Sequence, residues 1–221
     1  FCFEAVDFLE ELNVPAYKIG SGECNNYPLV EYIAKKKKPI ILSTGMNDLI
    51  SIKKSIKIIK KYNKNKIIIL HCTNLYPTPV HLVRLECVKL LQEQFKNEIV
   101  GLSDHTETNH TSFGSIPLGA RVIEKHYIDS KKTRKGPDVS ASADFEQLKD
   151  LIIGVKNIFR SLKGEKKIVN QEKITAKFAF ASVVSSKFIK KGEIFSKNNI
   201  TLKRPGTGIY GPSDFYKILG K

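Results

Sequence analysis

Two short segments of the chain carry histidines directly after apolar runs. The run Ile99–Val100 leads into Gly101–His105, and the run Ala120–Ile123 leads into Glu124–His126. If both runs are strands of a parallel sheet, the histidines lie at neighbouring carboxyl ends, where α/β folds build their ligand sites. Two such imidazoles can share a divalent metal ion. Either histidine taken alone could equally be a hydrogen-bonded residue near a loop, so the metal prediction depends on what surrounds the pair.

Other polar residues stand at the ends of further apolar runs. Ser103 and His105 are two positions apart, which places them on the same side of a strand. Single serines and asparagines near strand ends often only shape turns, but here they recur at every expected strand end. Together they offer ammonium, hydroxyl and amide donors for a phosphate or carboxylate group. The residues concerned are Lys18, Ser21, Glu23, Ser43, Asn74, Tyr76 and Ser103.

The elements that must position these residues alternate regularly between strand and helix. Five strand-then-helix units follow one another, which predicts a parallel sheet with right-handed crossovers. The regular alternation favours an α/β fold of the (β/α)8 TIM barrel type, of which about five of eight units would be present. Because the chain opens on Phe1 inside a helical pattern, we expect the other three units to precede it. The expected strands are Ala16–Ile19, Pro39–Ser43, Ile67–Leu70, Ile99–Gly101 and Val122–Glu124.

The expected helices show apolar residues at helical spacing. One of them has the stripe Leu49, Ile52, Ile56 and Ile59, and Asn47 is its expected N-cap. The other expected helices are Phe3–Leu12, Pro28–Lys36, Leu85–Phe95, Thr111–Leu118 and a long one from Phe145 to Phe159.

The character of the sequence changes after the long helix. We expect residues 1–163 to form the barrel part, 164–177 to form a charged linker and 178–221 to form a small separate domain. Short strands at Ala181–Val184 and Ile200–Leu202 and a final helix at Ser213–Leu219 are expected there. About 45 residues are marginal for independent folding, so this domain should dock on another surface.

Composition limits the function classes. The 221 residues are 41% hydrophobic and 27% charged, with a net charge of +15. Such a charge makes a non-catalytic binder of anions or nucleic acid an alternative. However, the basic residues are mostly lysines spread over expected helix surfaces with few aromatic residues between them, so we expect no nucleic-acid partner. The four cysteines lack metal or disulfide spacing, and no run is long enough for a membrane span, which together predict a cytoplasmic protein without a membrane partner.

Several motifs, taken in order, resemble the N-acetylneuraminate (sialic acid) synthase family. The resemblance runs from Phe1 to Lys221 and is more specific than any single motif. It implies a phosphoenolpyruvate-condensing TIM barrel followed by a small SAF domain, similar to type III antifreeze proteins and of the β-clip type. The motifs are Tyr17–Glu23, Ile41–Met46, Thr73–Pro79, Gly101–His105, Glu124–His126, Gly136–Asp138 and Lys203–Gly206.

The resemblance also implies a reaction, in which phosphoenolpyruvate and N-acetylmannosamine condense with water to give N-acetylneuraminate and phosphate. A divalent ion, Mn²⁺ with Mg²⁺ or Co²⁺ as alternatives, would be held by His105 and His126 and polarise the sugar aldehyde. Glu23 is the implied general acid/base, with Lys18 beside it as the second catalytic residue. The implied phosphoenolpyruvate-binding residues are Lys18, Ser21, Ser43, Asn74 and Ser103, and the implied sugar-binding residues are Glu23, Tyr76, Asp138, Phe178 and Arg204.

Further expectations follow from the same resemblance. Arg204 and Phe178 would reach the N-acyl group of a sugar in the partner subunit, which implies a domain-swapped homodimer. Legionaminate and pseudaminate synthases share the barrel, so a 6-deoxy-diacetamido sugar is an alternative acceptor. The segments Thr73–Pro79 and Phe178–Ser182 favour N-acetylmannosamine. We expect these 221 residues alone to be inactive, because the units expected before Phe1 carry further substrate contacts.

Overall fold

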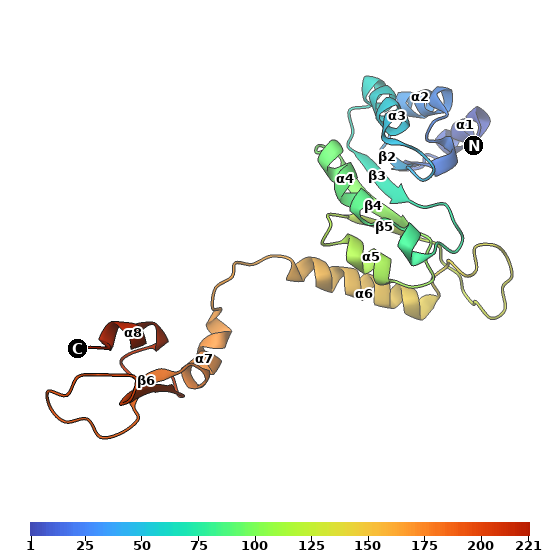
Figure 1. The fold of residues 1–221 in the computed structure, drawn as a ribbon. Coiled ribbons are helices and arrows are strands. Elements are labelled where there is room, and N and C mark those ends of the chain that lie inside the picture. The colour runs from blue at the N-terminus through green and yellow to red at the C-terminus, as the bar shows by residue number, and fades with distance from the viewer. The chain divides into compact units, whose positions relative to one another are not determined.

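A computed structural model describes residues 1–221, which form two compact units (Figure 1). Phe1–Lys163 is the larger unit and Gly164–Lys221 is the smaller unit. Each unit is described by itself below.

The larger unit is a parallel five-stranded sheet, and every strand but the last is joined to the next by a segment containing a helix. The strands lie in the order β1-β2-β3-β4-β5, so each strand pairs with its neighbours in the sequence. This unbroken order is typical of a barrel and differs from the reversed order of a doubly wound sheet. The prediction of an α/β fold with five parallel units is confirmed. The strands are β1 (Tyr17–Ile19), β2 (Ile40–Ser43), β3 (Ile67–Cys72), β4 (Ile99–Asp104) and β5 (Val122–Lys125).

Helices cover one face of this sheet, as Figure 1 shows. Their apolar stripes pack on alternate strand residues such as Ile19, Leu42 and Ile69, which are almost completely buried. The opposite face, which we call the inner face, carries the residues between them. The helices are α1 (Phe3–Glu11), α2 (Tyr27–Lys35), α3 (Leu49–Tyr62), α4 (Glu86–Gln94), α5 (His110–Ser115) and α6 (Phe145–Ser161), with short 3-10 turns at Ser21–Glu23 and Val80–Leu82.

The sheet is strongly curled, and an ion pair across its inner face shows how far. In a flat sheet, four inter-strand steps of about 4.8 Å would put β1 about 19 Å from β5. Lys18 Nζ on β1 nevertheless lies 2.8 Å from Glu124 Oε2 on β5. A lysine and a glutamate side chain cannot bridge the flat separation, so the two outer strands must bend toward each other. The five strands therefore form a half-barrel whose inner face is concave.

In the larger unit, two local expectations were wrong. The N-cap of α3 is Asp48, whose carboxylate accepts a 2.8 Å hydrogen bond from Ser51 N, and not Asn47. Asn47 instead donates to the backbone oxygens of Ser21 and Gly45, which ties the loop after β2 to the loop after β1. The helix expected at Thr111–Leu118 ends earlier, at Ser115, because Pro117 lacks the N–H that would continue it.

The smaller unit is built around a two-stranded antiparallel sheet. The segment expected as a linker, 164–177, contains a 3-10 turn at Asn170–Glu172 and most of helix α7 (Lys173–Ala179). The charges of this segment hid the helix, whose apolar residues Ile174 and Phe178 lie four positions apart. The two strands are β6 (Ser182–Ser185) and β7 (Ile200–Lys203). A 3-10 turn at Pro212–Asp214 and the short helix α8 (Phe215–Ile218) replace the longer final helix that was expected at Ser213–Leu219. The SAF assignment of this unit stays a prediction.

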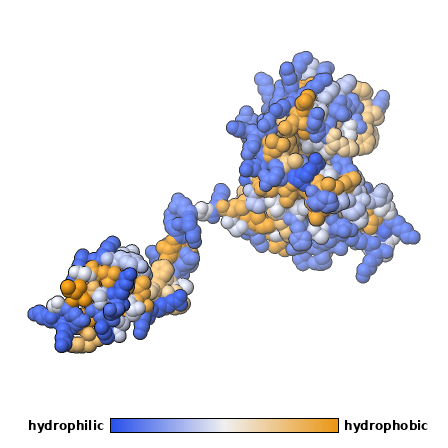
Figure 2. Space-filling model, in the orientation of Figure 1, coloured by the Kyte–Doolittle hydropathy of each residue, from blue (hydrophilic) through white to orange (hydrophobic).

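Figure 2 shows hydrophilic side chains over most of the visible face of the larger unit, with apolar patches between them. None of the helices combines the length and the apolar character needed to cross a bilayer.

A glycine in α6 yields a stability prediction. A Cβ added to Gly154 would lie 2.6 Å from Phe113 Cζ on α5, too close for unstrained packing. Alanine favours helices over glycine by about 1 kcal/mol, so propensity alone predicts that Gly154→Ala stabilises the protein. We expect the clash to dominate and to lower the free energy of unfolding by about 1–3 kcal/mol, measured by urea denaturation.

The exposed residue Asn157 on the same helix provides the control. Asn157→Ala changes helix propensity without entering the core, so it should raise the free energy of unfolding slightly. A stabilising effect of Gly154→Ala equal to that of Asn157→Ala would contradict the packing argument.

Candidate functional site

The inner face joins three elements of the predicted site through one carboxylate. Glu124 on β5 accepts hydrogen bonds from Lys18 Nζ at 3.0 Å and from Ser103 Oγ at 2.8 Å. Burial by itself would raise the pKa of Glu124, but the hydrogen bonds from Lys18 and Ser103 bring the pKa below its usual value. Glu124 is therefore an anion at neutral pH that orients one cation and one hydroxyl. Glu124 belongs to the predicted motif Glu124–His126, but no role was predicted for it.

Strand register explains why these side chains meet. Cys72, Ser103 and Glu124 are aligned across β3, β4 and β5, and alternation turns all three to the inner face. The Cys72 thiol donates to Asn74 Oδ1 at 3.1 Å and lies 3.8 Å from His105 Nδ1. Burial raises the pKa of Cys72, so its thiol stays protonated at neutral pH. Cys72 is a site residue that sequence analysis missed, although its place two positions before Asn74 could have indicated it.

The loops after β1 and β2 meet beside this cluster. Ser21 Oγ accepts a 3.0 Å hydrogen bond from Gly45 N. A Cβ on Gly45 would collide with the amide of Asn74, so only glycine lets that amide reach the inner face. Ser43 Oγ is buried and has no hydrogen-bond partner in the protein. An unpaired buried hydroxyl is costly, and a bound anion would satisfy it. Gly45 thus brings Ser21 and Asn74 close together, and Ser43, two residues before Gly45, adds a free hydroxyl at the end of β2.

The two predicted metal ligands are neighbours. The ring centroids of His105 and His126 are 5.2 Å apart, with ring planes at 76°. The ring of Tyr76 packs 4.2 Å from His105 and 5.7 Å from His126, so the three rings form one group. His105 follows β4 and His126 follows β5. Both continue the alternation of Ser103 and Glu124, so both histidines project from the inner-face side.

Hydrogen bonding fixes the tautomer of His105. Its Nδ1 lies 3.1 Å from the backbone oxygen of Thr73. A carbonyl only accepts, so Nδ1 carries the proton and Nε2 presents its lone pair. Burial is the main cause that lowers the pKa of His105, which keeps the ring neutral at neutral pH. A neutral imidazole held by a backbone carbonyl is the usual form of a metal-binding histidine.

The loop between β5 and α6 brings a carboxylate to His126. Ala143 N donates to His126 O at 2.7 Å, so the loop returns to the strand end it left. Asp138 on this loop places Oδ2 3.8 Å from His126 Nδ1, although its side chain is 55% exposed. Asp138 therefore stands at the rim of the site, where the resemblance placed a sugar-side residue.

The donor chemistry of His105 and His126 is compatible with an open metal site but not with a closed one. No three His, Cys, Asp or Glu side chains gather in an arrangement that could hold a metal ion. His105 and His126 alone would supply two nitrogen ligands and leave the other positions to water or substrate oxygens. A closed structural site uses four protein ligands, whereas a catalytic site keeps positions free. Catalytic sites commonly have three protein ligands, so two histidines would need a further ligand from water or substrate, and the metal site stays a prediction.

The structure does not gather every predicted residue. Glu23 lies in the turn after β1 and accepts a 2.8 Å hydrogen bond from Asn26 Nδ2, and it forms no hydrogen bond with the histidines. Phe178 and Arg204 belong to the smaller unit, where both side chains are exposed. The roles assigned to these three residues stay predictions.

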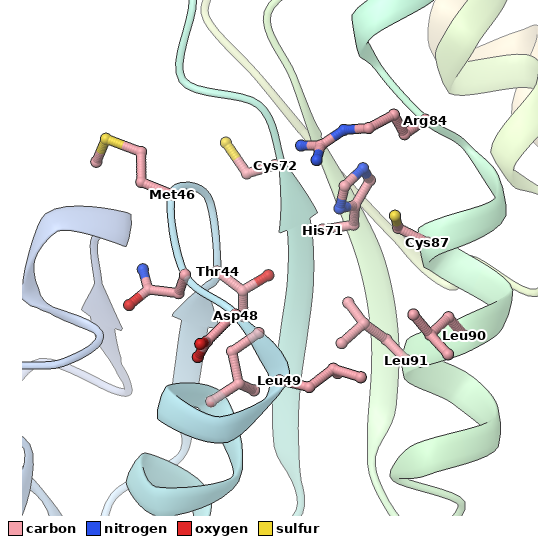
Figure 3. Close-up of a pocket in the computed structure, with 12 residues that line it drawn as sticks. Thr44, Met46, Asp48, Leu49, His71, Cys72, Arg84, Cys87, Leu90 and Leu91 are labelled. Atoms are coloured by element: carbon pink, nitrogen blue, oxygen red, sulfur yellow. The ribbon is translucent and has the colours of Figure 1, made fainter.

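A separate cavity of about 370 Å³ lies next to the site. Figure 3 shows that it is bounded by the loop after β2 on one side and by α4 on the other. Of the site residues described above, only Cys72 lines it, so substrate binding is better assigned to the inner face. His71 lines the cavity, and its Nε2 lies 2.6 Å from the backbone oxygen of Val83. This hydrogen bond gives His71 a structural role. The lining includes Thr44, Met46, Asp48, Leu49, His71, Cys72, Arg84, Cys87, Leu90 and Leu91.

Comparison with known proteins gives consistent relatives. N,N'-diacetyllegionaminic acid synthase of Campylobacter jejuni is 41% identical over 224 residues, covering 100% of this chain and 66% of that protein. Pseudaminic acid synthase of the same bacterium is 38% identical over 222 residues, covering 100% of this chain and 64% of that protein. The chain thus spans slightly less than two thirds of the length of these relatives.

A solved structure shares the fold. The N-acetylneuraminic acid (sialic acid) synthetase of Leptospira borgpetersenii, crystallised with citrate, superposes with a TM-score of 0.73 at 28% identity, covering 79% of this chain and 61% of that chain. The model of the NeuB family matches residues 1–167, which is most of the chain. This match, together with the similarity of the chain to sugar-acid synthases, shows that the chain belongs to the NeuB family.

Proposed function

We propose that this chain carries the donor and metal sites of a synthase that condenses phosphoenolpyruvate with an N-acylated amino sugar. One observation carries the proposal: the paired rings of His105 and His126 stand beside the Lys18–Glu124–Ser103 cluster on a single concave face. One side of that face suits an anion and the other suits a metal-bound carbonyl oxygen. The family relationship supports the same reaction class.

The proposed reaction forms one C–C bond and one C–O bond and breaks one C–O bond. The methylene carbon of phosphoenolpyruvate bonds to the aldehyde carbon of the open-chain sugar, and the aldehyde oxygen takes up a proton. Water adds to C2 of the donor and gives up one proton, which balances the proton taken up by the aldehyde oxygen. Phosphate then leaves with the bridging oxygen and the second proton, as the new C2 hydroxyl becomes the product ketone. A divalent ion, Mn²⁺ first and Mg²⁺ or Co²⁺ as alternatives, would be held by His105 and His126 and would polarise the aldehyde as a Lewis acid.

The chain's own residues divide the remaining work. Lys18, with Ser21, Ser43, Asn74 and Ser103, would bind the phosphate and carboxylate groups of the donor. Glu124 keeps Lys18 and Ser103 pointed at that position. Glu23 would move the proton to or from the aldehyde oxygen, and Tyr76 and Asp138 would contact the sugar.

N-acetylmannosamine is the first candidate acceptor, because the segments Thr73–Pro79 and Phe178–Ser182 favour it. The second candidate is a 6-deoxy-diacetamido sugar, which the 41% identity to a legionaminic acid synthase favours. Phe178 and Arg204 would contact the N-acyl group from the partner subunit of a homodimer. We expect turnover to require the three further barrel units of the family fold, so the assays below use the full-length protein that carries these residues.

Removal of either metal ligand should abolish metal binding. We expect His105→Ala and His126→Ala each to lose Mn²⁺ affinity and to lower kcat by about 10³-fold, because the loss of a Lewis acid costs several kcal/mol of transition-state stabilisation. Electron paramagnetic resonance of free Mn²⁺ measures the affinity. His110→Ala is the matched control, since His110 is exposed on α5 and should change neither quantity. Wild-type Mn²⁺ affinity in His105→Ala would refute the assigned ligand.

Neutralisation of the donor-site cation should act on donor binding. Lys18→Met removes a charge-assisted contact worth about 1.5–3 kcal/mol, so KM for phosphoenolpyruvate should rise by about 10- to 100-fold. It also frees Glu124, whose negative charge would then repel the donor. Lys36→Met removes a lysine that pairs with Asp7 at 2.8 Å outside the inner face and serves as the control. Equal KM values in Lys18→Met and Lys36→Met would exclude a donor-binding role for Lys18.

The acceptor is decided by direct competition. Steady-state rates with N-acetylmannosamine and with the 2,4-diacetamido-6-deoxy sugars should give the higher kcat/KM for N-acetylmannosamine if the first candidate is right. The opposite preference would assign the enzyme to legionaminate or pseudaminate synthesis.

The alternative of a non-catalytic anion or nucleic-acid binder rests on the net charge of +15. It expects binding to DNA or RNA that weakens steeply with added salt. A filter-binding titration at several salt concentrations, combined with the absence of turnover, would favour this alternative over the synthase.

A further inference from the structure

A buried ion pair lies directly behind the two histidines. Lys125 Nζ is 3.5 Å from Asp104 Oδ2, and the two side chains are only 3% and 0% exposed. Asp104 immediately precedes His105, and Lys125 immediately precedes His126. The two charged residues are also register partners across β4 and β5. Each histidine therefore directly follows one member of the ion pair, so the two pairs are offset by one residue along β4 and β5.

Alternation separates the two pairs by face. Neighbouring residues of a strand point to opposite sides of the sheet, so Asp104 and Lys125 point toward the helices while the histidines project from the inner-face side. Lys125 lines the groove between β5 and helix α6, which agrees with this orientation. The ion pair cannot contact a ligand on the inner face. Any influence of the pair on such a ligand must act through the backbone.

Lys125 ties down the loop that follows His105. Its ammonium donates to the backbone oxygens of Thr106 at 2.6 Å and Thr108 at 3.2 Å, in addition to the ion pair. Two of the three donors of the ammonium thus bond backbone oxygens, and its charge pairs with Asp104. The end of β5 is thereby fixed to the loop that begins at His105.

Asp104 makes a matching set of contacts on its own side. Its carboxylate accepts hydrogen bonds from Thr106 N at 2.9 Å, Thr111 Oγ1 at 2.8 Å and Ser112 Oγ at 2.6 Å. These bonds join the end of β4 to the first turn of α5. Apolar residues of similar volume would give comparable stability in such a buried place, but they would not fix two strand ends and one loop to defined positions.

We propose that Asp104 and Lys125 are positioning residues that set the separation of His105 and His126, and thereby the affinity for the divalent ion. The inference rests on the proposed function, since it concerns the same metal site. Neither residue touches substrate or metal. Their effect passes through the backbone from Asp104 to His105 and from Lys125 to His126.

The test is Lys125→Met in the full-length protein, with Mn²⁺ alone as the probe. Methionine keeps most of the side-chain volume and removes every donor. We expect Mn²⁺ affinity, measured from the resonance signal of free Mn²⁺, to fall by about 10-fold or more, as for residues that orient metal ligands. The Mn²⁺ concentration that gives half-maximal activity should rise by the same factor, and Lys125→Arg, which keeps the charge and donors, should recover part of the affinity.

A matched control separates positioning from general destabilisation. Lys60 Nζ bonds Glu98 Oε1 at 2.6 Å and the backbone oxygen of Asn65 at 2.9 Å, so it has the same kinds of partners at the opposite end of the strands. Lys60→Met should lower the melting temperature and leave Mn²⁺ affinity unchanged. If Lys125→Met does not fold, Ser112→Ala removes a single donor to Asp104 and should weaken Mn²⁺ binding by a few-fold.

The outcomes distinguish the two proposals. A wild-type protein that binds no Mn²⁺ and makes no product overturns the proposed function and this inference with it. A wild-type protein that binds Mn²⁺ and turns over, together with a folded Lys125→Met variant of unchanged Mn²⁺ affinity, overturns only the positioning role. The same holds for unchanged affinity in Ser112→Ala where Lys125→Met fails to fold.

Discussion

The curl of the parallel sheet is the constraint on which the candidate site depends. Only because β1 and β5 bend toward each other does Lys18 reach Glu124 across three intervening strands. The same curvature gathers residues from β3, β4 and the loops after β1 and β2 around one position. A flatter sheet with the same sequence would present them as isolated polar side chains. Sheet geometry, more than any single residue, makes the inner face a binding surface.

The two faces of the sheet divide stability from chemistry. The helix side is packed with isoleucine, leucine and valine from strands and helices, and it holds the Asp104–Lys125 pair. The inner side carries a carboxylate, a thiol, hydroxyl groups and, beyond the strand ends, imidazoles. Because the faces alternate with every residue, the chain can satisfy both requirements within strands of only a few residues.

Much of the fold could be predicted because its signals are local. Runs such as Ile67–Leu70 are apolar throughout, as expected of strands buried on both faces, and the polar residues that follow them mark the ligand edge. The neighbouring positions of His105 and His126 followed from that reasoning. The contact of Lys18 with Glu124 could not be predicted, because it joins residues 106 positions apart and depends on curvature. The N-cap at Asp48 was missed because Asn47 is an equally good capping residue type.

The one-residue offset between the histidines and the ion pair has a consequence for how these strands can change. Loss or gain of one residue within β4 or β5 would turn every later side chain of that strand to the opposite face of the sheet. Such an indel in β5 would turn Lys125 into the concavity and bury His126 among apolar helices. Point substitutions can alter this region gradually, whereas a change of length would swap the faces of Lys125 and His126 in a single step.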